Sequence, residues 1–305
     1  MKQNYIFNAS SEGYYKIAYT EWGYSHPGSA AVICVHGLTR NCRDFDALAR
    51  FLSVNGHHVF CPDIIGRGDS SWLSNSQHYN FKRYAMDMNV LIGRTGATQI
   101  DWLGTSMGGL IGILMASLPN TPIRSLILND VSPQVPIQAL WRLAKFAGKD
   151  PEFSTKEEAK KHYKKIYAEF GHLTEEQWNY FTEHSIKEKY AGTYISKFDP
   201  SIHDFGFKWQ TVKELFYSPH KALEGVLFDV DLWDVWRNIH CPVLVIRGHH
   251  SSLLLPEHIK KMQRTHPHVD FFEVEDAGHA PALLNEEEHE KILDWLDYIE
   301  DEIYS

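Results

Sequence analysis

The chain has 305 residues, of which 43% are hydrophobic and 23% are charged, ordinary values for a globular protein with a sizeable core. Its formal net charge of −9 and its lack of lysine and arginine runs argue against nucleic acid or an anionic membrane as a partner. The opening sequence MKQNYIFNASSEGYY has no apolar signal-peptide region. Four cysteines without CxxC spacing (Cys34, Cys42, Cys61 and Cys241) indicate free thiols, so a cytoplasmic location is expected.

Eight segments rich in β-branched and aromatic residues predict strands. They lie at 4–9, 14–22, 30–37, 57–63, 99–106, 124–132, 241–248 and 269–279. Amphipathic patterns between them predict helices at 43–54, 81–95, 107–118, 256–265 and 286–300. In the last helix, an apolar stripe is expected to pack against a sheet; it consists of Ile292, Trp295, Leu296 and Ile299.

The order of these elements predicts an α/β fold with an eight-stranded, mostly parallel sheet flanked by helices. The first two strands can pair as a hairpin, and from the third onward strands alternate with helices as in βαβ units. Residues 102–123 are uncharged, which raises the question of a membrane span. Their four glycines, with Thr105, Ser106 and Pro119, fit a buried strand–turn–helix better, and no membrane association is expected.

The alternation breaks between about residues 133 and 238. This stretch shows helical patterns at 136–147, 155–170, 174–185 and 207–217, and no convincing strand. We therefore predict a core domain formed by 1–132 and 238–305, with 133–237 as a helical lid over the carboxyl ends of the strands, where open α/β sheets bind ligands. A separate domain unrelated to the site is the alternative.

The sequence WLGTSMGGLIG places Gly104-Thr105-Ser106-Met107-Gly108 between an apolar strand and an apolar helix. This G-x-S-x-G pattern in that context predicts a sharp turn that exposes the serine hydroxyl above a helix N-terminus. A turn of small residues that only permits close helix–strand packing is the plainer interpretation. Three further motifs accompany it, two before it and one after it in the chain: VICVHGLTRN, CPDIIGRGDS and EDAGHAPALLNEEEH.

Together these motifs resemble the α/β-hydrolase superfamily, in its lid-bearing branch of esterases, lactonases, dehalogenases, carbon–carbon bond hydrolases and cofactor-free dioxygenases. The resemblance covers residues 30–132 and 230–300. It implies that Ser106 is the nucleophile and His279 its general base, with the backbone amides of Leu38 and Met107 as the oxyanion hole. His36 and Gly37 are expected at the substrate site, His36 mainly as a brace for its loop.

The acid of the catalytic triad is the point where the sequence departs from this family. The turn after the seventh strand, RGHHSSLLL, has Ser251 and Ser252 where an aspartate is expected. Asp130, at the end of the sixth strand, could be the substitute, or it could hold the lid hinge. Impaired catalysis and an introduced substitution at Ser252 are further explanations. A strand-seven acid is the commoner arrangement, which slightly favours a structural role for Asp130.

The resemblance implies a serine hydrolase of small or medium carboxylic esters, lactones or thioesters that works through an acyl-enzyme without a cofactor. There are two alternatives. One is a cofactor-free oxygenase or carbon–carbon bond hydrolase, and the other is a non-catalytic ligand-binding protein. The expected partner is a small-molecule substrate, and a homodimer is left open. No metal is expected, because the adjacent His249 and His250 should point apart and no cluster completes a site.

Overall fold

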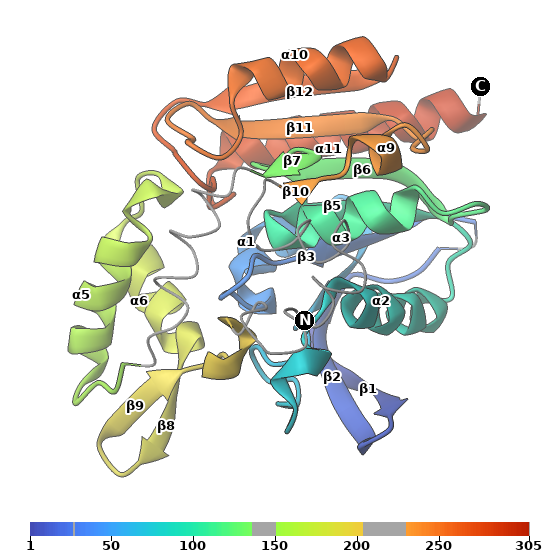
Figure 1. The fold of residues 1–305 in the computed structure, drawn as a ribbon. Coiled ribbons are helices and arrows are strands. Elements are labelled where there is room, and N and C mark those ends of the chain that lie inside the picture. Colours follow the sequence, from blue (N-terminus) through green and yellow to red (C-terminus); the bar gives the residue numbers. More distant parts are fainter. Residues whose placement is uncertain (27, 136–150, 204–229, 305) are drawn as a thin grey trace, which may run out of the picture.

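A computed structural model of the protein describes residues 1–26, 28–135, 151–203 and 230–304. An eight-stranded sheet runs through the molecule (Figure 1), in the order β1-β2-β4-β3-β5-β6-β11-β12. Its strands are β1 (Lys2–Ser10), β2 (Gly13–Trp22), β3 (Ala31–Val35), β4 (His58–Pro62), β5 (Ile100–Thr105), β6 (Ile123–Asn129), β11 (Val243–Gly248) and β12 (Val269–Val274). All eight predicted strands are present, and the predicted fold class is confirmed.

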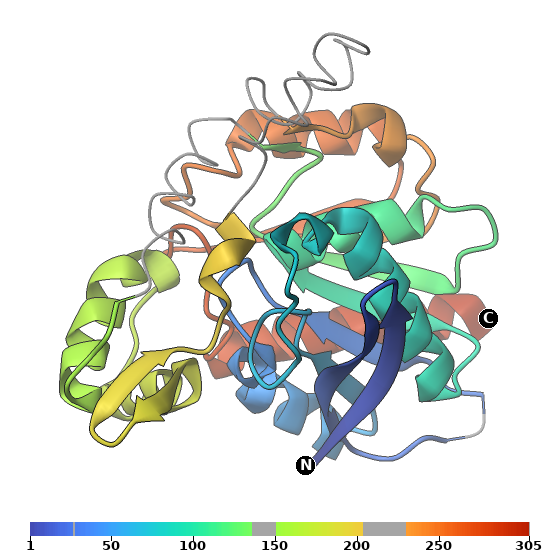
Figure 2. The ribbon, with the colours of Figure 1, turned by 60° about the horizontal axis from the view of Figure 1, so that its bottom comes forward.

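Strand pairing also follows the prediction. β1 and β2 form an antiparallel hairpin at one edge of the sheet (Figure 2), and β2 pairs antiparallel with β4. The remaining neighbours pair in parallel. Every residue of β3, β4, β6 and β11 is buried, because helices cover both faces of a parallel sheet and leave no polar face.

Helices pack on both faces of the sheet. On one face the core cluster contains side chains of α1 (Asp46–Val54) and α11 (Glu286–Tyr304), including the predicted stripe from Ile292 to Ile299. On the other face the cluster contains side chains of α2 (Phe81–Thr95), α3 (Met107–Ala116), α9 (Trp233–Trp236) and α10 (Pro256–Thr265). Short 3₁₀ turns occur at η1 (Cys42–Phe45) and η2 (Ser76–His78).

The ends of α2 coincide with the prediction because both carry a recognisable cap. The Asn80 side chain accepts a hydrogen bond from the Arg83 amide at the first turn, and Gly96 ends the helix with a left-handed φ of 72°. The uncharged residues 102–123 form most of β5, all of α3 and the start of β6. Within the described part of the chain, no helix combines the length and apolar character needed to cross a membrane.

Residues 151–203, which we call the inserted segment, lie between β6 and β11 in the chain and to one side of the sheet (Figures 1 and 2). They form α5 (Lys156–Ile166), η3 (Ala168–Phe170), α6 (Glu175–Ser185), β8 (Ile186–Tyr190), β9 (Thr193–Ser196) and η4 (Pro200–His203). The two helices match the patterns predicted at 155–170 and 174–185. The patterns at 136–147 and 207–217 fall outside the described residues.

The expectation of no strand between 133 and 238 was wrong. β8 and β9 form an antiparallel hairpin, and β7 (Gln134–Val135) pairs with β10 (Val230–Asp231). β8 reads IKEKY, so its mostly exposed, charged residues concealed the strand. The connecting Gly192, at φ 77°, was the available turn signal.

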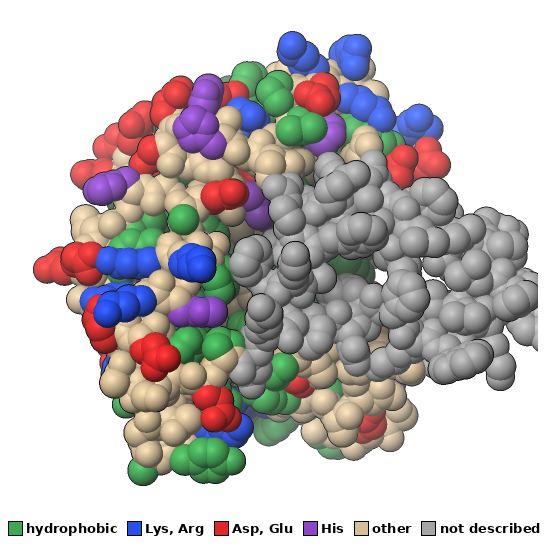
Figure 3. Space-filling model, turned by 60° about the vertical axis from the view of Figure 1, so that its left-hand side comes forward, with side chains coloured by type: hydrophobic (Ala, Val, Ile, Leu, Met, Phe, Trp, Pro, Cys, Tyr) green, Lys and Arg blue, Asp and Glu red, His purple; other side chains and the backbone are tan. Residues whose placement is uncertain are grey.

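Figure 3, turned to bring the inserted segment forward, shows acidic and basic side chains interspersed over this surface. The helices α5 and α6 carry ion pairs of Lys156 with Glu183, Lys160 with Glu157, and Lys164 with Glu175. Beneath them the segment has its own apolar cluster, in which Phe153, Tyr163, Trp178 and Phe181 are buried. These aromatic side chains therefore pack largely against one another within the inserted segment.

Candidate active site

The predicted site residues follow the carboxyl ends of neighbouring strands. Ser106 comes directly after β5, Asp130 directly after β6, and His279 in the loop after β12. Because β5, β6, β11 and β12 are adjacent and parallel, these ends meet at one edge of the sheet. The topology therefore brings together residues that are far apart in the sequence.

Ser106 occupies the strained turn that its motif predicts. Its φ of 50° and ψ of −112° place a non-glycine residue at positive φ, immediately before the first residue of α3. The flanking positions must be glycine because any side chain there would clash with the backbone. A Cβ on Gly104 would lie 2.3 Å from the Gly108 backbone, and a Cβ on Gly108 would lie 2.1 Å from the Val35 carbonyl oxygen. The turn thus depends on close backbone approach on both sides of the serine.

Ser106, His279 and Asp130 form one hydrogen-bonded chain. His279 Nε2 lies 3.0 Å from Ser106 Oγ, and His279 Nδ1 lies 2.7 Å from Asp130 Oδ2. Asp130 is fully buried, whereas the His279 side chain is 14% exposed. A carboxylate only accepts, so Nδ1 donates to Asp130 and Nε2 is left to accept the Ser106 proton. In this arrangement the hydroxyl faces a base that is itself oriented by a charge.

The turn after β11 holds the Asp130 carboxylate in place. The Gly248 amide donates to Oδ1 at 3.0 Å, and the Ser251 hydroxyl donates to Oδ2 at 2.6 Å. Ser251 Oγ in turn accepts from the amides of Leu253 and Leu254, which fixes its proton toward Asp130. The strand-seven turn, which lacks an acid, therefore supports a carboxylate supplied by strand six.

Ser252, the position where the acid was expected, is exposed and lies on the wall of the pocket described below. Ser251 is the serine that contacts the carboxylate, and sequence reasoning missed this role. The only feature of the sequence that pointed to Ser251 was its place beside Ser252 in the turn. Asn129 was also missed: its Nδ2 donates to Thr105 Oγ1 at 3.0 Å and to the Pro281 carbonyl at 2.9 Å. It thereby ties β5 and β6 to the segment after His279.

The loop after β3 carries the expected oxyanion donor Leu38 and its brace. The backbone amides of Leu38 and Met107 donate to no other backbone group in the described residues. His36 is buried, with its Nε2 accepting from the Ile64 amide at 3.0 Å and its Nδ1 donating to the Gly37 carbonyl at 2.7 Å. Burial lowers the pKa of His36 to about 3, so the ring is neutral. Both ring nitrogens of His36 are thus occupied, which fits the expected brace role, and the lining of the cavity described below includes Gly37 but not His36.

A cavity of about 300 Å³ opens above Ser106 and His279. Its core-domain wall includes Gly37, Leu38, Ser252 and Leu253. The opposite wall belongs to the inserted segment and is mostly apolar or aromatic: Tyr163, Ile166, Tyr167, Phe170 and Phe198, with Lys165 and Glu169 as charged members. Glu169, a residue that sequence reasoning did not single out, also contacts the histidine loop, because its Oε2 accepts from the His279 amide at 3.2 Å.

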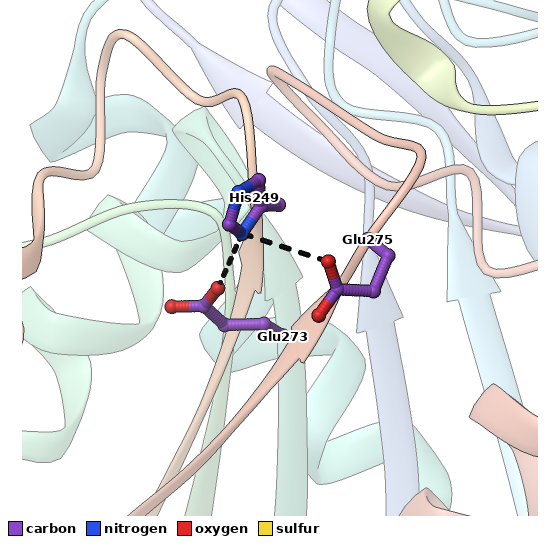
Figure 4. A group of neighbouring side chains, drawn as sticks. All are labelled: His249, Glu273 and Glu275. Atoms are coloured by element: carbon purple, nitrogen blue, oxygen red, sulfur yellow. Dashed lines mark hydrogen bonds and ion pairs between the residues drawn. The ribbon is translucent and has the colours of Figure 1, made fainter.

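His249 lies outside this arrangement, in a group with Glu273 and Glu275 (Figure 4). Its Nδ1 is 2.9 Å from Glu273 and 3.7 Å from Glu275, and the hydrogen bond from His249 lowers the pKa of Glu273. The rings of His249 and His250 lie edge to face with centroids 5.0 Å apart, so they do not point apart as expected. The group is exposed, with Glu275 84% accessible, and the hydrogen bond between His249 and Glu273 accounts for its arrangement.

Comparisons with known proteins place the chain in a family. Residues 30–286 match the family model for the alpha/beta hydrolase fold. The 3-hydroxybutyrate-oligomer hydrolase of Cupriavidus necator is 38% identical over 90% of this chain and 91% of its own length. Lipase 1 of Psychrobacter immobilis is 23% identical over 88% of this chain and 76% of its own.

Solved structures agree with this assignment. An alpha/beta hydrolase from Novosphingobium aromaticivorans superposes with a TM-score of 0.80 at 27% identity, covering 97% of this chain and 98% of its own. A Rickettsia typhi protein superposes with a TM-score of 0.85 at 34% identity, covering 98% and 99%. The sheet, the serine turn and these relatives together show that the chain belongs to the α/β-hydrolase family.

Proposed function

We propose that the protein is a serine hydrolase of carboxylic esters, with Ser106 as nucleophile, His279 as general base and Asp130 as the acid. The observation that carries the proposal is the chain of two hydrogen bonds, 3.0 Å and 2.7 Å long, that links the three side chains. Asp130 takes this role in place of the missing strand-seven acid, because its fully buried carboxylate accepts the hydrogen bond from Nδ1 of His279.

The reaction follows from these positions. Ser106 Oγ attacks the ester carbonyl carbon while His279 Nε2 takes its proton, and Asp130 stabilises the resulting imidazolium. The backbone amides of Leu38 and Met107 donate to the carbonyl oxygen as it becomes negative. His279 then returns the proton to the departing alkoxide, which leaves as an alcohol. A water molecule, deprotonated by the same histidine, then attacks the acyl carbon. The bond to Ser106 Oγ breaks, the carboxylic acid leaves, and His279 returns the proton to Oγ.

We further propose that the substrates are short oligoesters of hydroxy acids that keep a free carboxylate. A relative with 38% identity over 90% of the chain is a 3-hydroxybutyrate-oligomer hydrolase. The cavity suits such a molecule, because its apolar wall accepts short alkyl groups and Lys165 is exposed on its lining. Among the described residues Lys165 forms no ion pair, so its ammonium is available to the carboxylate of the leaving hydroxy acid.

The test combines labelling and turnover. The wild-type protein should react with a fluorophosphonate probe and hydrolyse p-nitrophenyl butyrate and the 3-hydroxybutyrate dimer. Ser106→Ala should abolish both reactions with an unchanged circular dichroism spectrum, since it removes one hydroxyl and opens no core cavity. Ser117→Ala, at the end of the same helix, is the matched control and should retain activity. A Ser106→Ala protein that keeps most of its turnover would show the nucleophile to be another residue.

A further inference from the structure

Arg67 lies in the Gly66-Arg67-Gly68 turn after β4 and is fully buried, with no exposed surface. Its guanidinium donates four contacts: Nε to the Leu38 carbonyl at 2.9 Å, Nη1 to the Ile65 carbonyl at 2.8 Å and to Tyr84 Oη at 3.0 Å, and Nη2 to Met107 Sδ at 3.7 Å. The rings of Tyr79 and Tyr84 also flank it, with centroids 5.8 and 5.1 Å from Cζ. All of these partners are uncharged.

This arginine differs from the other buried arginines of the described chain. Arg40 pairs with Asp44, Arg124 with Asp101, and Arg247 with Glu273. Arg67 forms no ion pair with any described residue; the hydroxyl of Tyr79, whose ring flanks it, donates to the Asp199 carboxylate. An unpaired charge in the interior is costly to the folded state. A group that brings a compensating negative charge close to it is therefore favoured.

The two residues that Arg67 joins are the two proposed oxyanion donors. Its Nε fixes the carbonyl of Leu38, and its Nη2 contacts the side chain of Met107. The turn that carries Arg67 is fixed from the other side by the inserted segment: the Gly68 amide donates to the Lys197 carbonyl at 2.7 Å, and the Asp199 amide donates to the Gly66 carbonyl at 2.7 Å. The guanidinium is thus held in one position, in contact with the Leu38 carbonyl and the Met107 side chain.

We propose that Arg67 is a positioning residue for the oxyanion hole, and that its unneutralised charge is compensated by the negative oxygen of the tetrahedral intermediate. The inference rests on the proposed ester hydrolysis at Ser106. Two effects contribute: the guanidinium holds the Leu38 and Met107 residues in their relative places, and its field favours negative charge in a site of low dielectric. Both act on the transition state more than on the bound substrate, so they affect kcat more than KM.

The experiment measures kcat and KM for p-nitrophenyl butyrate and inhibition by butylboronic acid, which forms a negatively charged tetrahedral adduct with a catalytic serine. Arg67→Met should lower kcat by about 100-fold and weaken boronic acid inhibition by a similar factor, with KM within about threefold. Arg67→Lys keeps the charge but loses the guanidinium fork, so a loss of about tenfold is expected. The matched controls Arg124→Met and Arg124→Lys remove a buried arginine that has a carboxylate partner; they should lower Tm and leave both readouts unchanged.

The proposal is overturned if Arg67→Met, or Arg67→Lys where the methionine variant does not fold, lowers Tm but keeps kcat within about threefold of wild type. It is equally overturned if the Arg124 variants lose as much kcat per folded molecule, or if KM rises while kcat is constant. A wild-type protein that neither hydrolyses the ester nor reacts with a fluorophosphonate overturns the proposed function together with this inference. Wild-type activity with unaffected Arg67 variants overturns this inference alone.

Discussion

Replacement of Asp130 by asparagine tests the assignment of the acid, and the structure gives the reason for a large effect. The Asp130 carboxylate accepts from the Gly248 amide at Oδ1, and from both Ser251 and His279 at Oδ2. An asparagine Nδ2 at the Oδ2 position would face His279 as a donor. The imidazole would then accept at Nδ1 and carry its proton on Nε2, where it can no longer take the proton of Ser106.

The opposite orientation of the amide does not rescue the site. Nδ2 would then face the Gly248 amide, and two donors in contact inside the protein cost about 1–3 kcal/mol. We therefore expect Asp130→Asn to lower kcat by about 10³–10⁴-fold, equivalent to about 4–5.5 kcal/mol of activation free energy. The assay is the initial rate with p-nitrophenyl butyrate, and thermal unfolding followed by circular dichroism reports whether the fold is kept.

Ser252→Asp is the complementary variant. Because Nδ1 of His279 already donates to Asp130 at 2.7 Å, a second carboxylate has no free proton to accept there, and kcat should stay within about threefold of wild type. The reasoning is refuted if Ser252→Asp raises kcat by orders of magnitude while Asp130→Asn lowers only the thermal stability. That pair of results would restore the structural role for Asp130 that the sequence slightly favoured.

Three further predictions concern other parts of the site. Burial lowers the pKa of His36 to about 3, below the value of about 6.5 expected in the unfolded chain; folding is therefore favoured above pH 6.5 and stability is lost as the pH falls toward 3. Between pH 7.5 and 5, the unfolding free energy in urea should fall by about 2 kcal/mol more in wild type than in His36→Asn, and equal losses would show that the ring is not held neutral. Lys165→Met should raise KM for the free-acid 3-hydroxybutyrate dimer about tenfold but not for its methyl ester; an equal change for both esters would remove the lysine from substrate binding. Gly248→Ala should lower both Tm and kcat, because its Cβ would lie 2.1 Å from the Gly278 carbonyl beside His279, and unchanged values would contradict that contact.

Local patterns were sufficient to predict the core of the fold. The buried strands are short apolar runs that end in turn residues, and helices such as α2 carry caps at both ends, so their limits follow from neighbouring residues alone. The hairpin of β8 and β9 was missed because its stability does not come from a local pattern. Its strands are partly exposed and charged, and they are stabilised by pairing with each other and by packing of the inserted segment, which no local pattern reports.

The positions of the proposed nucleophile and base could be inferred from the sequence because each lies in a motif with a defined strand and turn around it. The proposed acid, Asp130, could be named only as one of several explanations, because Asp130 and the turn at 248–252 are more than 100 residues apart and their contact depends on the adjacency of β6 and β11. Ser251 and Arg67 were missed for a related reason. A serine in a turn and an arginine in a glycine-rich loop have no distinguishing sequence signal until the fold shows which groups they contact.

The most direct test of the central claim is to trap the acyl-enzyme. Wild-type protein mixed rapidly with p-nitrophenyl butyrate and quenched in acid should show, by intact mass spectrometry, a single added butyryl group, and peptide mapping should place it on Ser106. The release of p-nitrophenol should show a burst of about one equivalent per molecule where deacylation is the slower step. Ser106→Ala should show neither the adduct nor the burst. Sustained turnover by the Ser106→Ala protein, or an adduct on another residue of the active wild type, would contradict the account.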